Sequence, residues 1–519
     1  MIEQLKLRHP DPFHDVPEAE FDARAADLSA RIGALTDWQA AIELQRLLAS
    51  LGEGHTGLRY IQPEFGAQGF PIRFQSYSDG IFVQAIGREH DRLAGARLLG
   101  IGEMPLSDVT SRLYPILSAD NGSGASRQIP FLLSVNLVLH GLGVILDPET
   151  ADYLLQRRDG EVERVSLAAR PVAQVESLLN PGADLAADPA WLRARDSAEE
   201  PEPLWLKRRA DLYWHEYLPD SRTLYVQVNR LYDRGDFNFA EFTGSVFEAY
   251  DAREPEKLVI DLRHNSGGDH IDLPFVHEII RRTALAERGR LFVLIGGSTF
   301  SAAQTFVNHL AKHTNAIFVG EQTGQRPNMY GVAGSFILPS SGLRVGHSRY
   351  YLQGADPADF RPGTMPDIPI VYTSADYAQN RDPALAAALG YRSEPLPDIV
   401  AAMTAQHASG GMEAAVTAYR SLQPRYVRQG VSSEAAVNRL GYALMRDGAL
   451  EEAIAIFRLN AESYPLSPNV HDSLAEALAA AGRRAEAVAA ARAALAINPS
   501  NIDARRRLRS IEAAQETPN

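Results

Sequence analysis

The chain has 519 residues, of which 45% are hydrophobic and 22% carry a charge, so its composition is that of an ordinary globular protein. Its length exceeds what one hydrophobic core supports and predicts roughly three or four domains. The net charge of −14 argues against a nucleic-acid-binding protein, which needs a basic surface to displace counterions from phosphates. The absence of cysteine excludes disulfides, thiolate zinc sites and cysteine nucleophiles.

No integral membrane segment is expected, because the sequence contains no run of about 18 apolar residues. The N-terminus also lacks the apolar stretch of a signal peptide. Two compartments therefore remain open. The protein is expected in the cytoplasm if Met1 is its true start, and in the periplasm or outside the cell if an export signal has been removed.

The first 203 residues are predicted to form two domains and a linker. Residues 1–69 form an N-terminal helical segment in this prediction, because apolar side chains recur there at helical spacing before a glycine-rich turn with His55. Residues 70–172 divide into short strand-like pieces with one helix-like stretch, in an order similar to that of a PDZ domain. Residues 173–203 are rich in proline, alanine and charge, which favours a linker.

Residues 204–392 alternate between predicted strands and helices. The strands are continuous apolar runs, which indicates that both faces of their sheet are buried and that the sheet is mostly parallel, with flanking helices. The expected strands are 224–228, 257–262, 290–295 and 316–320, and the expected helices are 238–251, 272–286 and 301–313. The sequence therefore predicts a multidomain α/β protein.

Residues 398–514 are rich in alanine and repeat with a period of 34 residues. Leu440 and Gly448, for example, recur as Leu474 and Gly482. This period and its small residues are typical of tetratricopeptide repeats, in which pairs of helices stack to bury their apolar faces. The repeats are interpreted equally well as a structural cap or spacer and as a peptide-binding groove, through which they could recruit a protein partner.

Two polar turns follow strands of the 204–392 region. The first, Asp261–Gly268, ends in two glycines whose N–H groups can approach a ligand closely. The second presents Ser301 at the start of a helix, where backbone N–H groups and the helix dipole favour the negative charge of an acyl-transfer intermediate. A serine before a helix is more often an N-cap than a nucleophile, so this turn alone does not assign a function.

Together the two turns resemble the motifs of the tail-specific, or C-terminal-processing, serine peptidase family. The match consists of D-L-R-x-N-x-G-G at Asp261–Gly268 and T-x-S-A at Thr299–Ala302, in the order and at the spacing of the family. The resemblance covers residues 204–392 and extends more loosely over residues 1–172. It implies that Ser301 attacks the scissile carbonyl.

The resemblance also implies an oxyanion hole, made by the N–H of Ala302 and that of Gly267 or Gly268. Much of the family uses a lysine as the base about 25 residues after the serine, but Arg326 stands there in this chain. Arginine stays protonated and cannot accept the serine proton. Arg326 is therefore expected either to bind the C-terminal carboxylate of a substrate or to form a structural ion pair.

The tricorn-like branch of the family uses a histidine from the N-terminal region, and Gly54-His55-Thr56 lies where that residue is expected. His55 can act as a general base near neutral pH. A histidine base also needs an orienting carboxylate. The resemblance leaves Asp356 and Asp359 as candidates for that role, with Asp359 preferred on its spacing from the serine.

The sequence thus predicts a serine peptidase that hydrolyses peptide or protein substrates through an acyl-enzyme, with no metal and no organic cofactor. The alternative is a non-catalytic binding protein of the same fold, as in retinoid-binding relatives of the family, with the repeats recruiting a partner. A constellation of Ser301, His55 and an aspartate within hydrogen-bond reach favours the enzyme. A His55 far from Ser301 favours the binding protein.

Overall fold

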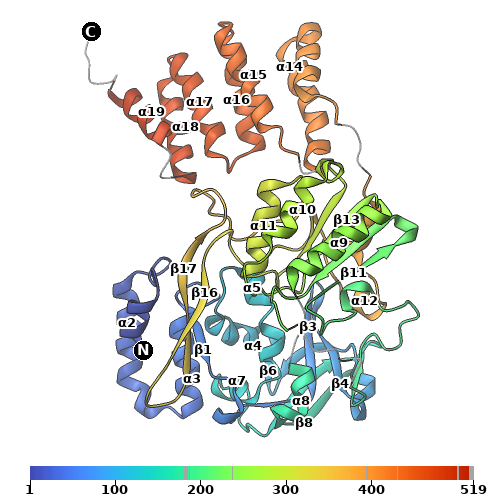
Figure 1. The fold of residues 1–519 in the computed structure, drawn as a ribbon. Helices are drawn as coiled ribbons and strands as arrows, with labels where there is room; N and C mark the ends of the chain where they lie inside the picture. The colour runs from blue at the N-terminus through green and yellow to red at the C-terminus, as the bar shows by residue number, and fades with distance from the viewer. Residues whose placement is uncertain are drawn as a thin grey trace. The chain divides into compact units, whose positions relative to one another are not determined.

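The computed structural model describes residues 1–179, 185, 188–235, 238–392, 396–428, 431–498 and 502–513. The chain divides into two compact units, Met1–Tyr391 and Arg392–Asn519 (Figure 1). Among the described residues, the first unit combines helices with four sheets, and the second contains helices. The predicted multidomain α/β class is confirmed at this level.

The chain begins with three helices and a short strand, and this strand pairs with a distant hairpin. The helices are α1 (Ile2–Arg8), α2 (Glu18–Arg31) and α3 (Asp37–Ala49), followed by β1 (Gly57–Arg59). β1 pairs antiparallel with β17 (Arg344–Gln353), which also pairs with β16 (Asn328–Ile337). The segment just after His55 is therefore fixed by residues far along the chain.

An antiparallel sheet follows, in the order β10-β4-β5-β7-β8, with β3 added on β4 and β6 added on β5. Its strands are β3 (Ile72–Tyr77), β4 (Gly80–Gly87), β5 (Arg97–Ile101), β6 (Met104–Pro105), β7 (Thr150–Gln156), β8 (Val162–Ala168) and β10 (Trp191–Arg193). The helices of this part are α4 (Leu106–Leu113), α5 (Gly122–Ser126), α6 (Ile129–Leu132), α7 (Asn136–Gly141) and α8 (Val172–Leu179). β2 (Gln68–Gly69) and β9 (Arg170–Pro171) form a separate antiparallel pair.

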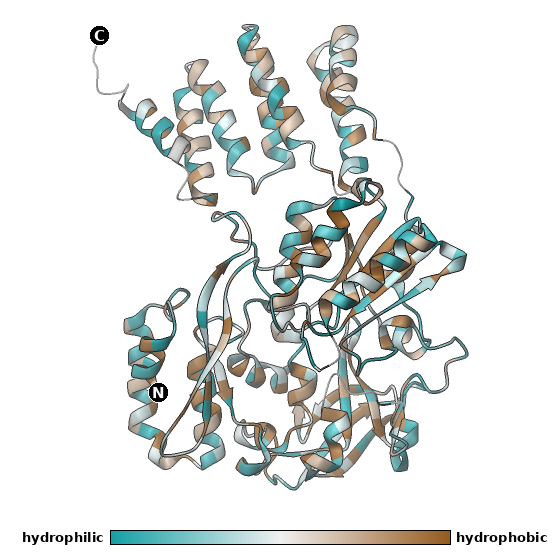
Figure 2. Cartoon of the chain, in the orientation of Figure 1, coloured by the Kyte–Doolittle hydropathy of each residue, from teal (hydrophilic) through white to brown (hydrophobic). Residues whose placement is uncertain are grey.

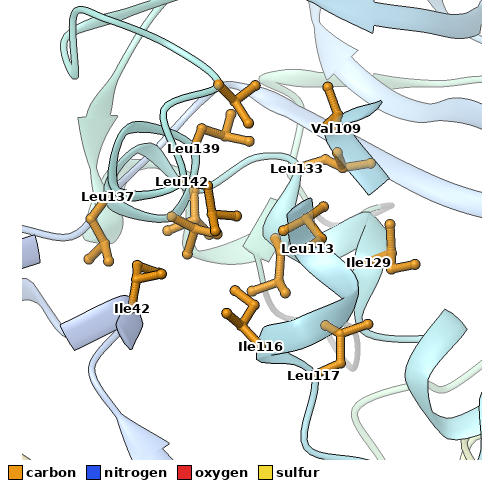
Figure 3. Close-up of a cluster of buried hydrophobic side chains, with 14 of the residues drawn as sticks. Ile42, Val109, Leu113, Ile116, Leu117, Ile129, Leu133, Leu137, Leu139 and Leu142 are labelled. Atoms are coloured by element: carbon orange, nitrogen blue, oxygen red, sulfur yellow. The ribbon is translucent and has the colours of Figure 1, made fainter. Parts of the chain in front are cut away.

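A single hydrophobic core joins the N-terminal helices to this antiparallel sheet. Figure 3 shows Ile42 of α3 close to Leu137 of α7, with Leu113 of α4 in the same cluster. Residues 1–69 and 70–172, which the sequence predicted as separate domains, therefore share their buried side chains. Burial of each fully enclosed leucine or isoleucine contributes about 1.5–3 kcal/mol, so this shared core ties the N-terminal segment firmly to the sheet.

The segment 173–203, predicted as a linker, contains regular structure in part of its described length. Helix α8 occupies its first residues, and β10 pairs antiparallel with β4. Trp191 of β10 is 3% exposed and packs with Val175 and Leu178 of α8. The proline, alanine and charge of the segment concealed the few large apolar residues that fold it back onto the sheet.

The second part of the first unit is built on a six-stranded sheet in the order β11-β12-β13-β14-β15-β18. Its strands are β11 (Tyr213–Leu218), β12 (Thr223–Val228), β13 (Lys257–Asp261), β14 (Leu291–Ile295), β15 (Ile317–Gly320) and β18 (Ile368–Pro369). β11 runs antiparallel to β12, and all other neighbours are parallel. The four strands predicted for this region and the mostly parallel sheet are confirmed.

Helices cover both faces of this sheet. On one face lie α9 (Phe239–Arg253), α10 (Leu273–Arg281) and α11 (Ala302–His313), and on the other lies α13 (Pro383–Gly390), which follows α12 (Ser374–Ala378). The strands β12 to β15 are buried along their whole length, and Figure 2 shows this sheet as largely hydrophobic. Coverage on both faces explains why these strands read as continuous apolar runs.

The second unit contains helices whose pairs repeat. They are α14 (Ile399–Arg428), α15 (Glu434–Arg446), α16 (Leu450–Ser463), α17 (Pro468–Ala480), α18 (Arg484–Ile497) and α19 (Ile502–Ala513). The starts of α15 and α17 differ by 468 − 434 = 34 residues, and those of α16 and α18 by 484 − 450 = 34 residues. The helices therefore follow the period found in the sequence, while their assignment as tetratricopeptide repeats stays a prediction.

No helix in the described ranges is both long enough and apolar enough to cross a bilayer.

Candidate active site

The site lies at the carboxyl ends of the parallel strands β13 and β14. β14 ends at Ile295, and a short loop leads to Ser301 at the start of α11. The loop is held by Thr299, whose hydroxyl accepts the N–H of Gly296 and donates to the carbonyl of Leu262 at 2.9 Å. This bond connects the loop after β14 to the turn after β13, which carries the glycines of the first motif.

Ser301 has the backbone conformation of a residue held under strain. Its φ is 57° and its ψ is −124°, values that residues with a side chain rarely adopt. Although Ser301 occupies the N-cap position of α11, its side chain makes no capping hydrogen bond. The hydroxyl therefore does not act as an ordinary helix cap and is available for another interaction.

His55 contacts this hydroxyl. Its Nε2 lies 3.0 Å from Oγ of Ser301, and its ring stacks on Phe300 with centroids 4.6 Å apart. The imidazole also hydrogen-bonds to the backbone of Tyr330 in β16. Nε2 faces the serine, so the tautomer with the proton on Nδ1 leaves Nε2 able to accept the proton of Ser301.

Burial lowers the pKa of His55 to about 4, because the protein interior disfavours the imidazolium. The charge of Glu53 and the bond to Tyr330 oppose this shift but are smaller effects. His55 is therefore neutral at physiological pH.

Gln325 contacts both members of the pair. Its Oε1 accepts the backbone N–H of Ser301 at 2.5 Å, and its Nε2 lies 3.3 Å from Nδ1 of His55 and 3.5 Å from the carbonyl of Tyr330. The side chain is completely buried. It thus fixes the backbone at Ser301 while lying beside the imidazole.

The glycine turn approaches the serine closely. A Cβ on Gly267 would lie 2.6 Å from Cβ of Ser301, and the φ of Gly267 is 106°, so only glycine fits. The N–H of Gly267 already donates to Oδ1 of Asn265 at 2.9 Å. Within the described residues, the N–H groups of Gly268 and Ala302 donate to no protein acceptor. The N–H of Gly268, rather than that of Gly267, is therefore the donor of this turn that has no acceptor among the described residues.

Asp356 and Asp359 do not reach His55. The carboxylate of Asp359 binds Arg361, and that of Asp356 accepts the N–H of Ala358 within the same turn. This local pairing is the usual role of aspartate in a turn, and it overturns the expectation that one of them orients the histidine. Both backbone carbonyls instead hold the side chain of Asn328.

Arg326 forms an ion pair with Asp15, with Nη2 2.7 Å from Oδ2. Its Nε also points to the backbone carbonyl of Asp120 at 3.4 Å. Of the two roles that the sequence allowed for Arg326, the structural ion pair is the one observed. Neither contact involves Ser301.

Two buried carboxylates near His55 were missed by sequence reasoning. Glu53 is 2% exposed and accepts hydrogen bonds from Ser348 at 3.0 Å and from Thr56. Burial alone would raise the pKa of Glu53, but the hydrogen bond and charge of His9, 3.1 Å away, together with the two hydroxyls hold it below the usual value. Its position two residues before His55 was the only signal in the sequence.

Asp120 is the second missed carboxylate. Its Oδ2 accepts the N–H of Gly54 at 2.9 Å, which holds the turn that carries His55. Burial and the nearby charge of Glu53 raise the pKa of Asp120 to about 7. Nothing in the sequence marked Asp120, because it approaches the turn only through the fold.

Comparison with known proteins relates part of the chain to a peptidase family. Residues 276–370, which include Ser301 and Gln325, match the model of peptidase family S41. A crystal structure of a CPAF mutant is 13% identical over 76% of this chain and 97% of its own, with a TM-score of 0.52, which shows a shared fold. No curated protein sequence matches the chain.

Two further solved structures are similar to a lesser degree. Mature CPAF is 14% identical over 71% of this chain and 89% of its own, with a TM-score of 0.47. The photosystem II D1 C-terminal processing protease is 13% identical over 71% of this chain and 91% of its own, with a TM-score of 0.32.

Proposed function

Because residues 276–370 belong to peptidase family S41, we propose that this chain is a serine-type peptidase that hydrolyses peptide bonds through an acyl-enzyme on Ser301. The observation that carries the proposal is the 3.0 Å contact between Oγ of Ser301 and Nε2 of His55. A nucleophile and a base within hydrogen-bond reach are what acyl transfer requires.

In the first step, Oγ of Ser301 attacks the scissile carbonyl carbon while its proton passes to Nε2 of His55. The carbonyl oxygen becomes an oxyanion. When this intermediate collapses, the C–N bond breaks and His55 returns the proton to the leaving amine. Water then repeats the sequence on the acyl-enzyme, releasing the carboxylic acid product and restoring Ser301.

The oxyanion is stabilised in this proposal by the N–H groups of Ala302 and Gly268, supported by their lack of other acceptors among the described residues. The positive end of the α11 dipole adds to this stabilisation. The strained backbone of Ser301 and the bond from its N–H to Gln325 hold the nucleophile in place before substrate arrives.

The base is oriented without a directly bonded carboxylate. The carbonyl of Tyr330 selects the tautomer with the proton on Nδ1, and Gln325 packs beside the ring. Glu53 acts through its charge, which favours the imidazolium formed during the reaction. A buried carboxylate can therefore assist His55 without contacting it.

The alternative, a non-catalytic binding protein, is less well supported because it gives no reason for the approach of His55 to Ser301. In either case the repeats of residues 398–514 are available to recruit a protein partner, as the sequence suggests.

A fluorophosphonate probe, which reacts covalently with activated serines, tests the proposal. The wild-type protein is expected to become labelled and to cleave an unstructured peptide, whereas Ser301→Ala should do neither while keeping its unfolding free energy within about 1 kcal/mol. Ser298→Ala is the matched control and should keep its labelling, since Ser298 lies in the same loop without contacting His55. A Ser301→Ala protein that still cleaves peptide would end the proposal.

A further inference from the structure

A cavity of about 930 Å³ lies next to the candidate active site and is not used by the chemistry above. Ser266, which precedes Gly267, and Ser298, in the loop before Ser301, both line it. The cavity reaches into the antiparallel sheet, where residues of β3 form another wall. Its volume is in the range of sites that enclose a ligand of several residues or a drug-sized molecule.

Positive charge dominates the lining. Seven arginines face the cavity, and Glu321 is the only carboxylate among the described lining residues. The chain as a whole has a net charge of −14, so this concentration of arginine runs against its overall composition. A cavity wall of one sign focuses its field on the enclosed space and attracts ligands of the opposite sign.

Some of these arginines are neutralised by the protein. Arg193 binds Asp196, Arg195 binds Glu202, and Arg263 binds both Asp261 and Asp382. They are held in structural ion pairs.

Arg127 and Arg230 are different, since no carboxylate of the described residues lies within ion-pair distance of either. The Arg127 guanidinium lies over the ring of Phe300, 5.4 Å from its centroid. Arg230 donates to the backbone carbonyls of Asn229 and His264. Burial lowers the pKa of both side chains, and the charge of Arg230 lowers that of Arg127 further. Two cations that repel each other in one cavity favour an anion between them.

The positive charge of the cavity also lies close to Ser301 and His55. Phe300, on which Arg127 lies, directly precedes Ser301 and stacks against His55. A substrate carboxylate bound at Arg127 therefore lies close enough to Ser301 to belong to the same peptide whose scissile bond reaches Ser301. Phe74, Phe131 and Trp205 supply apolar wall, so the cavity suits a segment with both acidic and apolar groups.

We propose that this arginine-lined cavity binds a carboxylate of the peptide substrate, with Arg127 and Arg230 as its ligands. This inference rests on the proposed peptidase function for the identity of the ligand. Two sources supply such a carboxylate: an aspartate or glutamate side chain, and the C-terminus of the substrate. Guanidinium groups bind a carboxylate from either source through charge-assisted hydrogen bonds.

The test measures binding by full-length Ser301→Ala protein, so it needs no cleavage. The probes are fluorescein-labelled unstructured peptides of alanine, glycine and leucine, either with glutamates or with glutamines at the same positions, and each with an amidated or a free C-terminus. Fluorescence anisotropy at low salt gives each dissociation constant. The glutamate or the free-acid peptide is expected to bind about tenfold more tightly than the neutral amidated one, and to lose that advantage as salt rises.

A comparison of the peptides identifies the source of the carboxylate. An advantage of glutamate over glutamine in amidated peptides indicates an acidic side chain, and an advantage of the free acid in glutamine peptides indicates the C-terminus. Equal affinity for all four peptides would overturn the inference.

Arg127→Gln, made in the Ser301→Ala protein, should abolish the preference for carboxylate peptides. Arg24→Gln removes the same charge from an exposed position on α2 and should leave the preference unchanged. An equal loss in both variants would show a non-specific charge effect and would contradict the inference. The peptide comparison does not depend on folding of the Arg127 variant, and fluorophosphonate labelling of the wild type separately tests the peptidase itself.

Discussion

At the scale of single residues, the proposed reaction depends on the protonation state of His55. The imidazole must be neutral to accept the proton of Ser301, and burial favours this neutral form. An ordinary histidine would lose half of its basic form near pH 6.5. With its pKa lowered to about 4, His55 keeps the basic form into a more acidic range.

We therefore expect kcat/KM for a small peptide to fall on acidification with an apparent pKa of about 4, because protonation of His55 removes the base. A second inflection near pH 7 is expected from Asp120, whose charge changes in that range and which holds the Gly54–His55 turn. The pH profile of Asp120→Asn separates the two, since it should lose the inflection near 7 and keep the acidic one. An inflection near 6.5 that persists in Asp120→Asn would contradict the lowered pKa of His55.

The sequence singled out the two residues of the proposed reaction because each lies in a short local motif. Ser301 follows a buried strand, and His55 lies in a glycine-rich turn. Gln325 was visible beside Arg326 but received no role, because its contacts with Ser301 and His55 form only when three loops meet in the fold. Spacing along the chain carries no information about such contacts.

The carboxylates show the same limit, because spacing along the chain again failed to predict which side chains approach His55. Asp356 and Asp359 were chosen by their distance along the chain from Ser301. In the structure both carboxylates instead form hydrogen bonds within their own turn, with Ala358 and Arg361. Glu53 and Asp120 reach the site through packing of the N-terminal region, which no local pattern encodes.

At the scale of elements, the small sheet formed by β1, β16 and β17 positions His55, the proposed base. Gly57 pairs with Gly346 and Arg59 pairs with Arg344, so the turn before β1 is fixed against the hairpin. Glu53 strengthens this link by accepting a hydrogen bond from Ser348 of β17. The parallel strands were predicted correctly because burial on both faces gives them a local pattern, whereas the pairing of β1 with β17 is a contact between distant segments.

Replacing Glu53 should therefore disturb the base as well as the fold. In Glu53→Ala, the buried groups of His9, Thr56 and Ser348 lose their shared acceptor, which should cost about 3 kcal/mol of unfolding free energy. Urea unfolding measures this loss, and the rate of fluorophosphonate labelling should fall as the turn loosens. Glu64→Ala, at an exposed position in the same unit, should change neither quantity measurably. A Glu53→Ala protein of unchanged stability and labelling rate would show that the sheet alone fixes the turn.

At the scale of the whole molecule, each unit has hydrophobic clusters of its own. Those of the first unit end at Tyr391, and those of the second begin at Ile399. The proline-containing, polar sequence of residues 392–397 predicts a linker in the same interval, of which residues 393–395 lie outside the described residues. All residues of the candidate site belong to the first unit.

A chain ending after Arg392 should consequently remain folded and keep its fluorophosphonate labelling and its cleavage of an unstructured peptide. The end point matters, because Nζ of Lys257, the first residue of β13, donates to the carbonyls of Ala388 and Tyr391. A shorter chain ending before Pro383 removes α13, whose Ala384, Leu385 and Ala388 cover one face of that sheet, and should lose both structure and labelling.

Circular dichroism and size-exclusion chromatography of the two truncated chains, with probe labelling, check this contrast. If the chain that ends after Arg392 still cleaves the unstructured peptide but turns over a folded protein substrate more slowly, recruitment of substrate or partner is assigned to the repeats. Loss of labelling in the chain that ends after Arg392 would mean that the helical unit supports the catalytic one, and the boundary between independent units would then have to be abandoned. The chain that ends before Pro383 is the negative control for labelling. If it is still labelled without α13, the probe does not report an intact sheet.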